Sequence, residues 1–457
     1  MNSLKKNSSF FTILILYCFF NNHALAQSPN IIFILTDDQR WDALGHAGNG
    51  VINTPEMDRL AEQGAYFRNA FVTTPICAAS RASFITGLYE HTHDYTFGPD
   101  ALRDEFIPSS YPLLLREAGY HTGFYGKFGI KYDKFDELFD VGESYDRNGR
   151  FKDHRGYFYK TLDDDTVHLT RYTGQKALDF IDQAPAGKPF SLSLSFSAPH
   201  AHDPAEAQYF WQEEVDGLYA DKEMAPAPIS EDRYFDEQPE FVKAGLNRER
   251  WYWRYDTPEK YQHSVKGYYR MISGIDLEIG RIRKKLEEKG MADNTVIILM
   301  GDNGYFLNER QFAGKWLMYD NSLRVPLIIY DPRGNQPQDI STMALNIDVP
   351  ATMLQLAGVD VPDEYEGLGL LDLVQGKKSK LKRKYFHCEH LWDFDRIPAS
   401  EGIRTEQWKY FRYRDYPEHE ELYDLEKDPM EINNLAKNPN YRKVLKKMRK
   451  KLEVIIK

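Results

Sequence analysis

The sequence predicts an α/β protein, with a large mixed, mostly parallel sheet sandwiched by helices and a smaller C-terminal α+β subdomain. Two continuous apolar runs of strand length, residues 30–35 and 295–300, are typical of parallel strands that are buried on both faces. The clearest helix covers residues 267–289, where apolar residues recur every three or four positions before Gly290 ends the pattern. Beyond about Leu370 the composition shifts to Lys and Arg, which indicates a second, smaller unit.

The length of the chain agrees with this division. At 457 residues it exceeds the size of a usual single hydrophobic core. We therefore expect a large domain over residues 27–370 and a C-terminal subdomain over residues 371–457.

The first 26 residues have the pattern of a cleavable signal peptide. Two lysines precede an apolar run over residues 10–20, and Ala24-Leu25-Ala26 offers a small-residue cleavage site. A membrane anchor is the alternative, but the run is short for a span and polar residues follow it directly. We expect a periplasmic or secreted protein without a membrane span.

Charge argues against nucleic acid as a partner, and cysteine content argues against a disulfide framework. The formal charge of the full chain is -11, and removal of Lys5 and Lys6 with the signal peptide makes it about -13. Such an acidic protein is a poor binder of nucleic acid, so an anionic substrate would need a local cationic pocket and a metal. Only Cys77 and Cys388 remain after cleavage, too few for a disulfide framework, although a bridge between them is conceivable.

Polar side chains follow both apolar runs directly. Asp37 and Asp38 come after the first strand, and Asp302 and Asn303 come after the second. Strand ends of an α/β sheet commonly hold ligand sites, and two adjacent carboxylates are costly unless a cation neutralises them. Four oxygen ligands without imidazole favour Ca²⁺, or less strongly Mg²⁺, over zinc. A solvated turn is the alternative interpretation of Asp37 and Asp38.

A second candidate feature is the segment around Cys77. A helix over residues 54–64 and a strand over residues 66–72 lead to it, and small and polar residues place Cys77 at the start of a helix. The helix N-terminus favours an anion, and Arg81, one turn later, can hold a tetrahedral oxyanion. A buried structural cysteine is the alternative.

The middle of the chain adds a lysine and two histidines beside predicted strands. A helix over residues 113–118 and a strand over residues 120–125 lead to Lys127, and a strand over residues 190–197 leads to His200 and His202. A histidine at such a strand end can act as acid or base near neutral pH. We interpret residues 130–170 as a polar excursion near the mouth of the site. The aromatic residues within 203–262 suit either sugar rings or core packing.

After a further helix over residues 348–358, the C-terminal region has short strand patterns. They cover residues 384–387, 402–405, 408–412 and 421–425, and a basic helix follows. Between the first two, His390, Trp392 and Arg396 are expected on a loop that reaches the mouth of the site, with His390 as a substrate-binding candidate.

The run Cys77-Ala78-Ala79-Ser80-Arg81 resembles the C-x-[PA]-S-R signature of the type I, formylglycine-dependent sulfatases of the alkaline phosphatase superfamily. The four oxygen ligands, Gly126-Lys127-Phe128, Pro199-His200, Gly314-Lys315 and the C-terminal run 421–431 resemble family segments in the same order. The resemblance covers nearly the whole mature chain and is closest to bacterial carbohydrate sulfatases.

The resemblance implies a mechanism. Cys77 would be oxidised to Cα-formylglycine by a formylglycine-generating enzyme or an anaerobic maturase, and its hydrated aldehyde would be the nucleophile and a ligand of Ca²⁺. Arg81, Lys127 and Lys315 would hold the sulfate, and His200 would protonate the leaving oxygen. His202 is a weaker substrate-side candidate. Many family members carry a histidine where this sequence has Gly129.

The implied reaction is the hydrolysis of sulfate monoesters, on a sulfated carbohydrate such as ulvan, carrageenan or a glycosaminoglycan. A phosphonate or phosphodiester hydrolase of the same superfamily is one alternative. A non-catalytic protein that binds sulfated glycans, with Cys77 as a free thiol, is another.

Overall fold

The structure is a computed structural model, and it describes residues 28–150, 155–203, 205–334 and 337–456. The predicted signal peptide, residues 1–26, lies outside this range. Within it, none of the helices combines the length and the apolar character that crossing a membrane requires.

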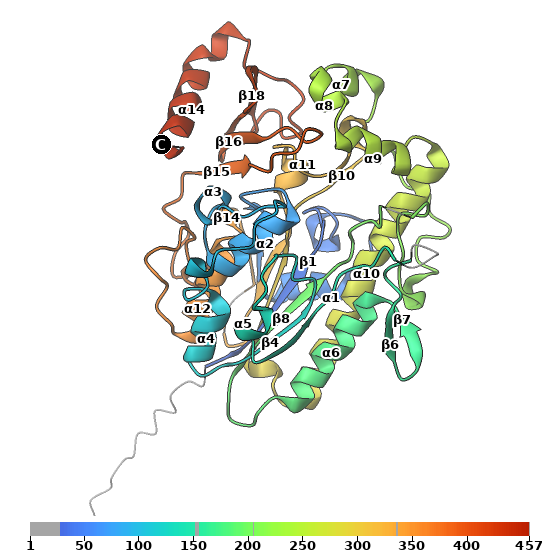
Figure 1. Ribbon diagram of the computed structural model, residues 1–457, viewed down its shortest axis with the longest axis vertical. Helices are drawn as coiled ribbons and strands as arrows, with labels where there is room; N and C mark the ends of the chain where they lie inside the picture. Colours follow the sequence, from blue (N-terminus) through green and yellow to red (C-terminus); the bar gives the residue numbers. More distant parts are fainter. Residues whose placement is uncertain (1–27, 151–154, 204, 335–336, 457) are drawn as a thin grey trace, which may run out of the picture.

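An eight-stranded sheet forms the centre of the molecule, in the order β13-β2-β12-β9-β1-β8-β4-β5 (Figure 1). Only β12 runs against its neighbours β9 and β2, so the sheet is mostly parallel, as predicted. The strands are β1 (Asn30–Thr36), β2 (Ala65–Phe67), β4 (His121–Gly126), β5 (Val141–Ser144), β8 (Phe190–Phe196), β9 (Thr295–Gly301), β12 (Leu327–Tyr330) and β13 (Gln338–Ile340).

Helices cover both faces of this sheet (Figure 1). Side chains alternate between the faces of a strand, so Ile31 and Phe33 of β1 join one core while Ile32 and Ile34 join the other. The first core includes α2 (Cys77–Thr86), α4 (Tyr111–Glu117) and α12 (Asp348–Ala357). The second includes α1 (Pro55–Gln63), α6 (Leu169–Gln183) and α10 (Pro258–Glu288). The fold class predicted from the sequence is confirmed.

The register of the central strands brings the predicted ligand residues together. Thr36 of β1 is the parallel partner of Gly301 in β9 and of Phe196 in β8. Because these strands end level with one another, the segments that follow them meet at one edge of the sheet. Asp37, Asp302 and His200 therefore come to the same place from positions far apart in the chain.

Two predicted elements differ in extent from the observed ones. The strand expected over residues 66–72 is divided into β2, which belongs to the central sheet, and β3 (Ala70–Phe71), which pairs with β14 (Ala344–Leu345). The long helix α10 begins at Pro258 rather than near residue 267, because Thr257 caps it by accepting a hydrogen bond from Lys260 N.

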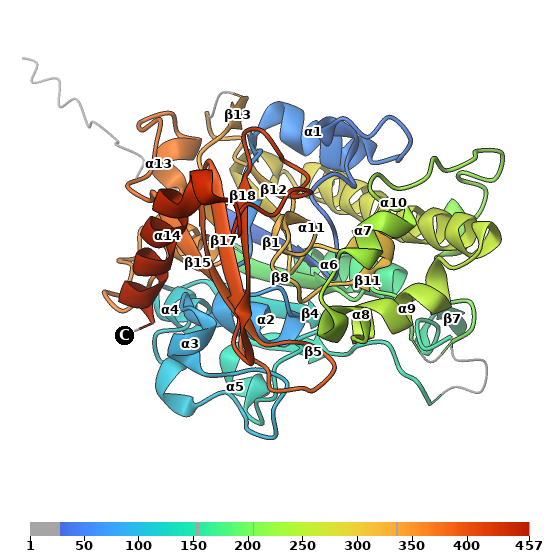
Figure 2. The same cartoon turned by 90° about the horizontal axis from the view of Figure 1, so that it is seen from above.

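The C-terminal region forms a second, antiparallel sheet with one helix on it (Figure 2). Its strands are β15 (Tyr385–His390), β16 (Ser400–Thr405), β17 (Trp408–Tyr413) and β18 (Tyr416–Asp424), and the helix is α14 (Arg442–Ile455). One face packs against α14 in a small core, whereas Phe386, Phe411 and Tyr413 on the other face join the core of the large domain. The two parts are therefore packed together.

The remaining elements are short, apart from α9, and lie around the sheets. They are α3 (Glu90–His93), α5 (Phe135–Leu138), β6 (Lys160–Leu162), β7 (Asp165–Val167), α7 (Asp232–Asp236), α8 (Glu240–Lys243), α9 (Leu246–Arg254), β10 (Phe306–Leu307), β11 (Ala313–Gly314), α11 (Asp320–Leu323) and α13 (Leu371–Val374).

Candidate active site

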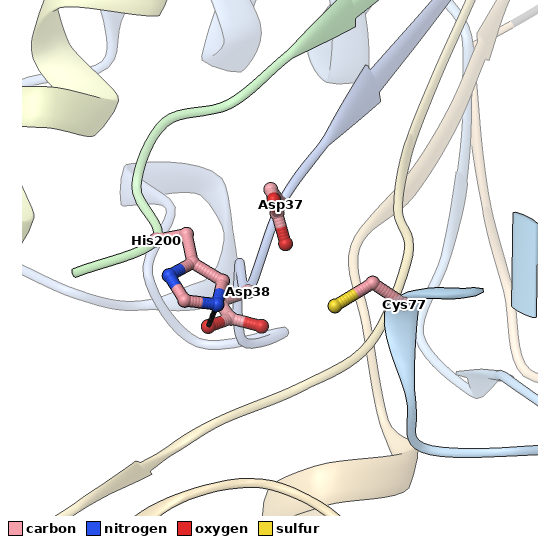
Figure 3. A group of neighbouring side chains, drawn as sticks. All are labelled: Asp37, Asp38, Cys77 and His200. Atoms are coloured by element: carbon pink, nitrogen blue, oxygen red, sulfur yellow. Dashed lines mark ion pairs between the residues drawn. The ribbon is translucent and has the colours of Figure 1, made fainter. Parts of the chain in front are cut away.

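Four potential ligand groups converge at the edge of the sheet where β1 and β8 end. One atom each of Asp37, Asp38, Cys77 and His200 lies within 4.8 Å of the others, and all four residues are buried. Figure 3 shows that Asp37 and Asp38 follow β1, that His200 comes from the loop after β8, and that the sulfur of Cys77 points towards the carboxylates. The fold therefore brings a thiol, two carboxylates and an imidazole together around one point.

The segment after β9 completes this cluster. Asp302 Oδ1 accepts a hydrogen bond from Asp38 N at 3.1 Å, and Asn303 Nδ2 donates to Asp38 Oδ1 at 2.6 Å. Asp38 has a left-handed backbone (φ 70°), and Tyr268 of α10 holds this turn by donating its hydroxyl to Asp38 O. The long helix therefore fixes where the carboxylates point.

Three oxygens of this cluster lack a hydrogen-bond partner among the described residues: Asp37 Oδ1, Asp38 Oδ2 and Asn303 Oδ1. Buried polar atoms are normally satisfied, so three orphaned oxygens at one place indicate a missing positive partner. All three are hard oxygen donors, which fit a Ca²⁺ or Mg²⁺ ion. The donor set thus suits the cation that the sequence predicted.

Cys77 is the first residue of α2 and is almost fully buried. Lys315 Nζ lies 2.9 Å from its sulfur. Burial raises the pKa of the unmodified Cys77 thiol, because the charges of Lys127 and Lys315 do not compensate for desolvation and Asp37 opposes ionisation. Cys77 and Cys388 are both free thiols, so the conceivable bridge between them is wrong.

Cationic side chains surround the acids and the thiol. Lys127 Nζ donates to Asp37 Oδ2, and Lys315 Nζ donates to Asp38 Oδ1. Burial by itself would raise the pKa of Asp37, but the charges of Lys127, Lys315 and Arg81 outweigh it and hold this pKa well below its usual range. Asp37 is therefore ionised at neutral pH.

Arg81 is held in place by three separate partners. Its Nε donates to Asp302 Oδ2 at 2.9 Å, and its Nη1 donates to Lys127 O and Ser195 Oγ, each at 2.6 Å. Burial and the neighbouring Asp37 raise the pKa of Asp302 to about 6, although Arg81 counteracts this. The Arg81 guanidinium thus holds the Asp302 carboxylate in position and lies close to Asp37.

His200 is oriented by the backbone and by an arginine. Its Nδ1 lies 2.5 Å from Ala201 O, which makes Nδ1 the protonated nitrogen and leaves Nε2 to accept from Arg147 Nη2 at 3.1 Å. His200 Nε2 also lies 3.5 Å from Asp38 Oδ2. Burial, followed by the charge of Arg147, lowers the pKa of His200 well below its ordinary value, so the imidazole is neutral at pH 7.

The site opens into a cavity of about 480 Å³. Cationic, acidic and aromatic side chains line it: Cys77, Phe97, Lys127, Gly129, Asp146, Arg147, His200, Asp203, Leu246, Arg250, Lys315, Trp316, Trp392 and Phe394. A tetrahedral anion with an attached apolar or ring-shaped group matches this combination of charge at the base and aromatic faces at the mouth.

Sequence reasoning missed several of these residues. Asp146 and Arg147 come from the segment interpreted only as a polar excursion, and no motif marks them. Arg250 and Leu246 both line the cavity from α9, and their spacing of four residues, which puts them on one helix face, is a signal that could have identified them. Arg250 lies over the Trp316 ring and pairs with Asp203.

The weaker histidine candidates lie elsewhere. His202 and His390 are buried, and neither belongs to the described residues that line the cavity. His202 packs edge-on against Tyr157 and Phe210, and His390 is the last residue of β15. The expected loop does reach the mouth of the cavity, but through Trp392 and Phe394 rather than through His390.

Comparison with known proteins agrees with this geometry. The family model described as Sulfatase matches residues 29–359, and the model described as N-sulphoglucosamine sulphohydrolase, C-terminal, matches residues 308–457. An arylsulfatase of Clostridium perfringens is 29% identical over 92% of this chain and 93% of that protein. An N-acetylglucosamine-6-O-sulfatase of Bacteroides thetaiotaomicron is 27% identical over 93% of this chain and 86% of that protein.

A solved structure, described as a complex with its substrate D-glucosamine-2-N,6-O-disulfate, superposes with a TM-score of 0.79. It is 25% identical, and the match covers 94% of this chain and 97% of that one. The family model spans most of the chain and includes the Cys77 segment and both acidic strand ends. The chain belongs to the sulfatase family and is a hydrolase of sulfate esters.

Proposed function

We propose that this sulfatase removes sulfate from a sulfated carbohydrate, with Cys77, after its conversion to formylglycine, as the nucleophile and Ca²⁺ as the metal. The observation that carries the proposal is the position of Cys77. Its sulfur lies beside the two acids and 2.9 Å from Lys315 Nζ, in a cavity whose walls carry Lys127, Arg147 and aromatic side chains.

The residues that would hold the metal are Asp37, Asp38, Asp302, Asn303 and residue 77. The orphaned oxygens of Asp37, Asp38 and Asn303 support this assignment. A set of five protein ligands favours Ca²⁺ over Mg²⁺, because Mg²⁺ usually keeps several of its waters and binds through only one or two carboxylates. The ion, when bound, would polarise a sulfate oxygen and lower the pKa of the nucleophile.

The side chains around residue 77 would divide the remaining tasks. Lys127 and Lys315 both point towards the acids and the thiol, where they would neutralise charge on the sulfate oxygens, and Arg81 would orient Asp302 and the sulfate. His200 holds Nε2 beside Arg147 at the cavity wall. This nitrogen carries no proton in the neutral imidazole, so it would take one up before it protonates the departing sugar oxygen. A hydrated aldehyde supplies a second hydroxyl, whose loss of a proton expels the sulfate.

Carbohydrate is the substrate class that the relatives and the cavity favour. One relative is named for N-acetylglucosamine 6-sulfate chemistry, and the superposed structure holds a disulfated glucosamine. In this chain Trp316, Trp392 and Phe97 line the cavity, and aromatic faces suit sugar rings. The substrate-side roles predicted for His202 and His390 are not part of this proposal, because both are buried and neither is among the described residues that line the cavity. Maturation by a formylglycine-generating enzyme or an anaerobic maturase, and export to the periplasm or medium, belong to the same proposal.

The nucleophile is tested by substitution. Cys77→Ala and Cys77→Ser should each abolish hydrolysis of an aryl sulfate while circular dichroism and the melting temperature stay close to wild type, because neither variant has the thiol whose oxidation would give the aldehyde. Intact mass of the Cys77 peptide should show the aldehyde. Substantial turnover by Cys77→Ala, or a thiol in fully active enzyme, would contradict the assignment.

A paired assay separates the alternatives. An aryl sulfate, an aryl phosphodiester and a phosphonate ester are offered to the same preparation, and kcat/KM should be largest for the sulfate. Faster cleavage of the phosphorus esters would favour the hydrolase alternative. Binding of sulfated glycans without turnover of any ester, together with an unmodified Cys77, would favour the non-catalytic alternative.

The metal is tested by exhaustive dialysis against a chelator. Activity should fall to background and return with Ca²⁺, because Asp37, Asp38 and Asn303 each have a buried oxygen without a hydrogen-bond partner among the described residues. Metal content is measured alongside activity. The dialysed preparation should contain less than about 0.1 equivalent of divalent metal per protein. Full activity of that preparation would show that the four-oxygen site has no role in catalysis.

A further inference from the structure

A second group of metal-ligating side chains lies away from the candidate active site. One atom each of His91, His387 and Glu389 lies within 4.8 Å of the others. His387 and Glu389 are two residues apart on β15 and therefore project from the same face of that strand. His91 comes from the short helix α3 of the large domain. The group thus joins the C-terminal sheet to the large domain.

The three side chains of this group contact one another, and one of the imidazoles lacks hydrogen bonds. His91 Nδ1 lies 2.8 Å and 3.0 Å from the two oxygens of Glu389, and His387 Nδ1 lies 3.5 Å from Glu389 Oε2. The His387 side chain is only 3% exposed, and neither of its ring nitrogens makes a hydrogen bond to another described residue. A buried imidazole whose two nitrogens make no hydrogen bond, beside a carboxylate, needs a further partner.

The carboxylate of this group has only imidazoles as counter-charges. Glu389 is almost fully buried. Among the residues described by the structure, no lysine or arginine forms a salt bridge with it, and its ion-pair partners are His91 and His387. A divalent cation would provide a stronger counter-charge than these imidazoles do.

We propose that His91, His387 and Glu389 bind a Zn²⁺ ion that fastens the C-terminal sheet to the segment before Cys77. Two imidazole nitrogens and one carboxylate are a ligand set that zinc favours and that Ca²⁺ does not. The His91 side chain is 34% exposed, so solvent reaches the group and water can occupy the fourth position.

The position of the group gives the ion a structural role. Glu389 N donates to Thr73 O at 2.9 Å, and Thr74 Oγ1 donates to Glu90 Oε2 at 2.7 Å. Both threonines belong to the segment that ends at Cys77. Zinc at this group therefore stabilises the packing that sets the start of α2, without contacting the substrate cavity.

The test uses the full chain carrying Cys77→Ser and saturated with Ca²⁺, so that neither the thiol nor the candidate active site competes for zinc. Titration with Zn²⁺ should show one equivalent bound and a rise in melting temperature of about 2–5 °C at a hundredfold excess over Kd. Anomalous diffraction at the zinc edge should place the ion between the three side chains.

Variants decide whether the three residues are the ligands. His387→Ala and His91→Ala should each weaken zinc binding at least about tenfold and abolish the thermal shift. His91 is partly exposed, so its variant keeps the test informative if His387→Ala fails to fold. His390→Ala is the matched control, because His390 is equally buried on β15 but projects from the opposite face. Equal zinc affinity in all four proteins, or anomalous density only beside Asp37 and Asp38, would overturn the proposal.

Discussion

At the scale of single residues, Gly129 shows how closely the candidate active site is packed. It has φ +71°, and a Cβ added there would lie 2.7 Å from Arg81 Cδ. Arg81 cannot move away easily, because Asp302 and Ser195 hold its guanidinium. The side chain that many family members carry at this position therefore has no room in this chain.

Substitution of Gly129 should consequently damage the site. Gly129→Ala should lower kcat/KM for an aryl sulfate about 10- to 100-fold, because displacement of Arg81 misplaces the sulfate. Gly129→His should be no better. Gly358→Ala is the matched control: it has the same φ of +71° with no atom within 4 Å of the added Cβ. It should cost about 1–2 kcal/mol of stability but leave kcat/KM unchanged. Wild-type activity of Gly129→Ala would show that the site is less rigid than described.

At the scale of elements, α10 supports α1 through a buried carboxyl group. Asp276 accepts hydrogen bonds from Met57 N at 2.7 Å and Glu56 N at 3.2 Å, which satisfies the first turn of α1. Burial raises the pKa of Asp276 to about 7, although these two hydrogen bonds oppose the shift. Between about pH 4 and pH 7 the folded protein therefore keeps a proton on Asp276. The unfolded chain releases this proton, because an ordinary aspartate has a pKa near 4.

The contribution of Asp276 to the stability of the folded protein decreases as the pH rises. The stabilisation from Asp276 is complete below about pH 4 and is lost as the pH rises towards about 7. Asp276→Asn cannot titrate, so its urea midpoint should fall less than that of the wild type between pH 5 and pH 8. The difference between the two proteins isolates this residue from other titrating groups. Parallel curves for the two proteins would show that Asp276 is already ionised at pH 5.

At the scale of the whole molecule, buried charges join the C-terminal sheet to the large domain. Lys409 of β17 is fully buried; its Nζ lies 2.6 Å from Glu431 and also contacts Asp320, the first residue of α11. Arg404 adds a contact to Asp320 at 2.9 Å. Burial would raise the pKa of Asp320, but Arg404 and Lys409 hold it well below its usual range.

Removal of the central cation should loosen this junction. Lys409→Met should lower the free energy of unfolding by about 3–5 kcal/mol, because Glu431 and part of Asp320 would remain buried and unpaired. Lys427→Met is the control: its pair with Asp424 is solvent-exposed on the lysine side and should contribute less than about 1 kcal/mol. Urea denaturation of the three proteins measures both values, and equal midpoints would mean that the buried network contributes nothing to docking.

The sequence alone determined two central strands, β1 and β9, and the acidic part of the site. The runs that became β1 and β9 are apolar on both faces, and parallel strands buried in this way must end at a common edge. Asp37, Asp38, Asp302 and Asn303 could therefore be assigned to one place without knowledge of the fold. Local patterns also located the start of α1, where Pro55 stands in the first turn, and the start of α2, where small and polar residues surround Cys77.

Only the tertiary structure decided which side chains the segments without periodicity bring to the candidate sites. Arg147 reaches His200, and Arg250 reaches Trp316, because loops and a short helix pack over the sheet edge. The same holds for His91, which is almost 300 residues away from His387 and Glu389 and meets them only when the C-terminal sheet docks. Such contacts depend on long-range packing, which leaves no local periodicity in the chain, whereas the strand-end acids follow from the direction of their own strands.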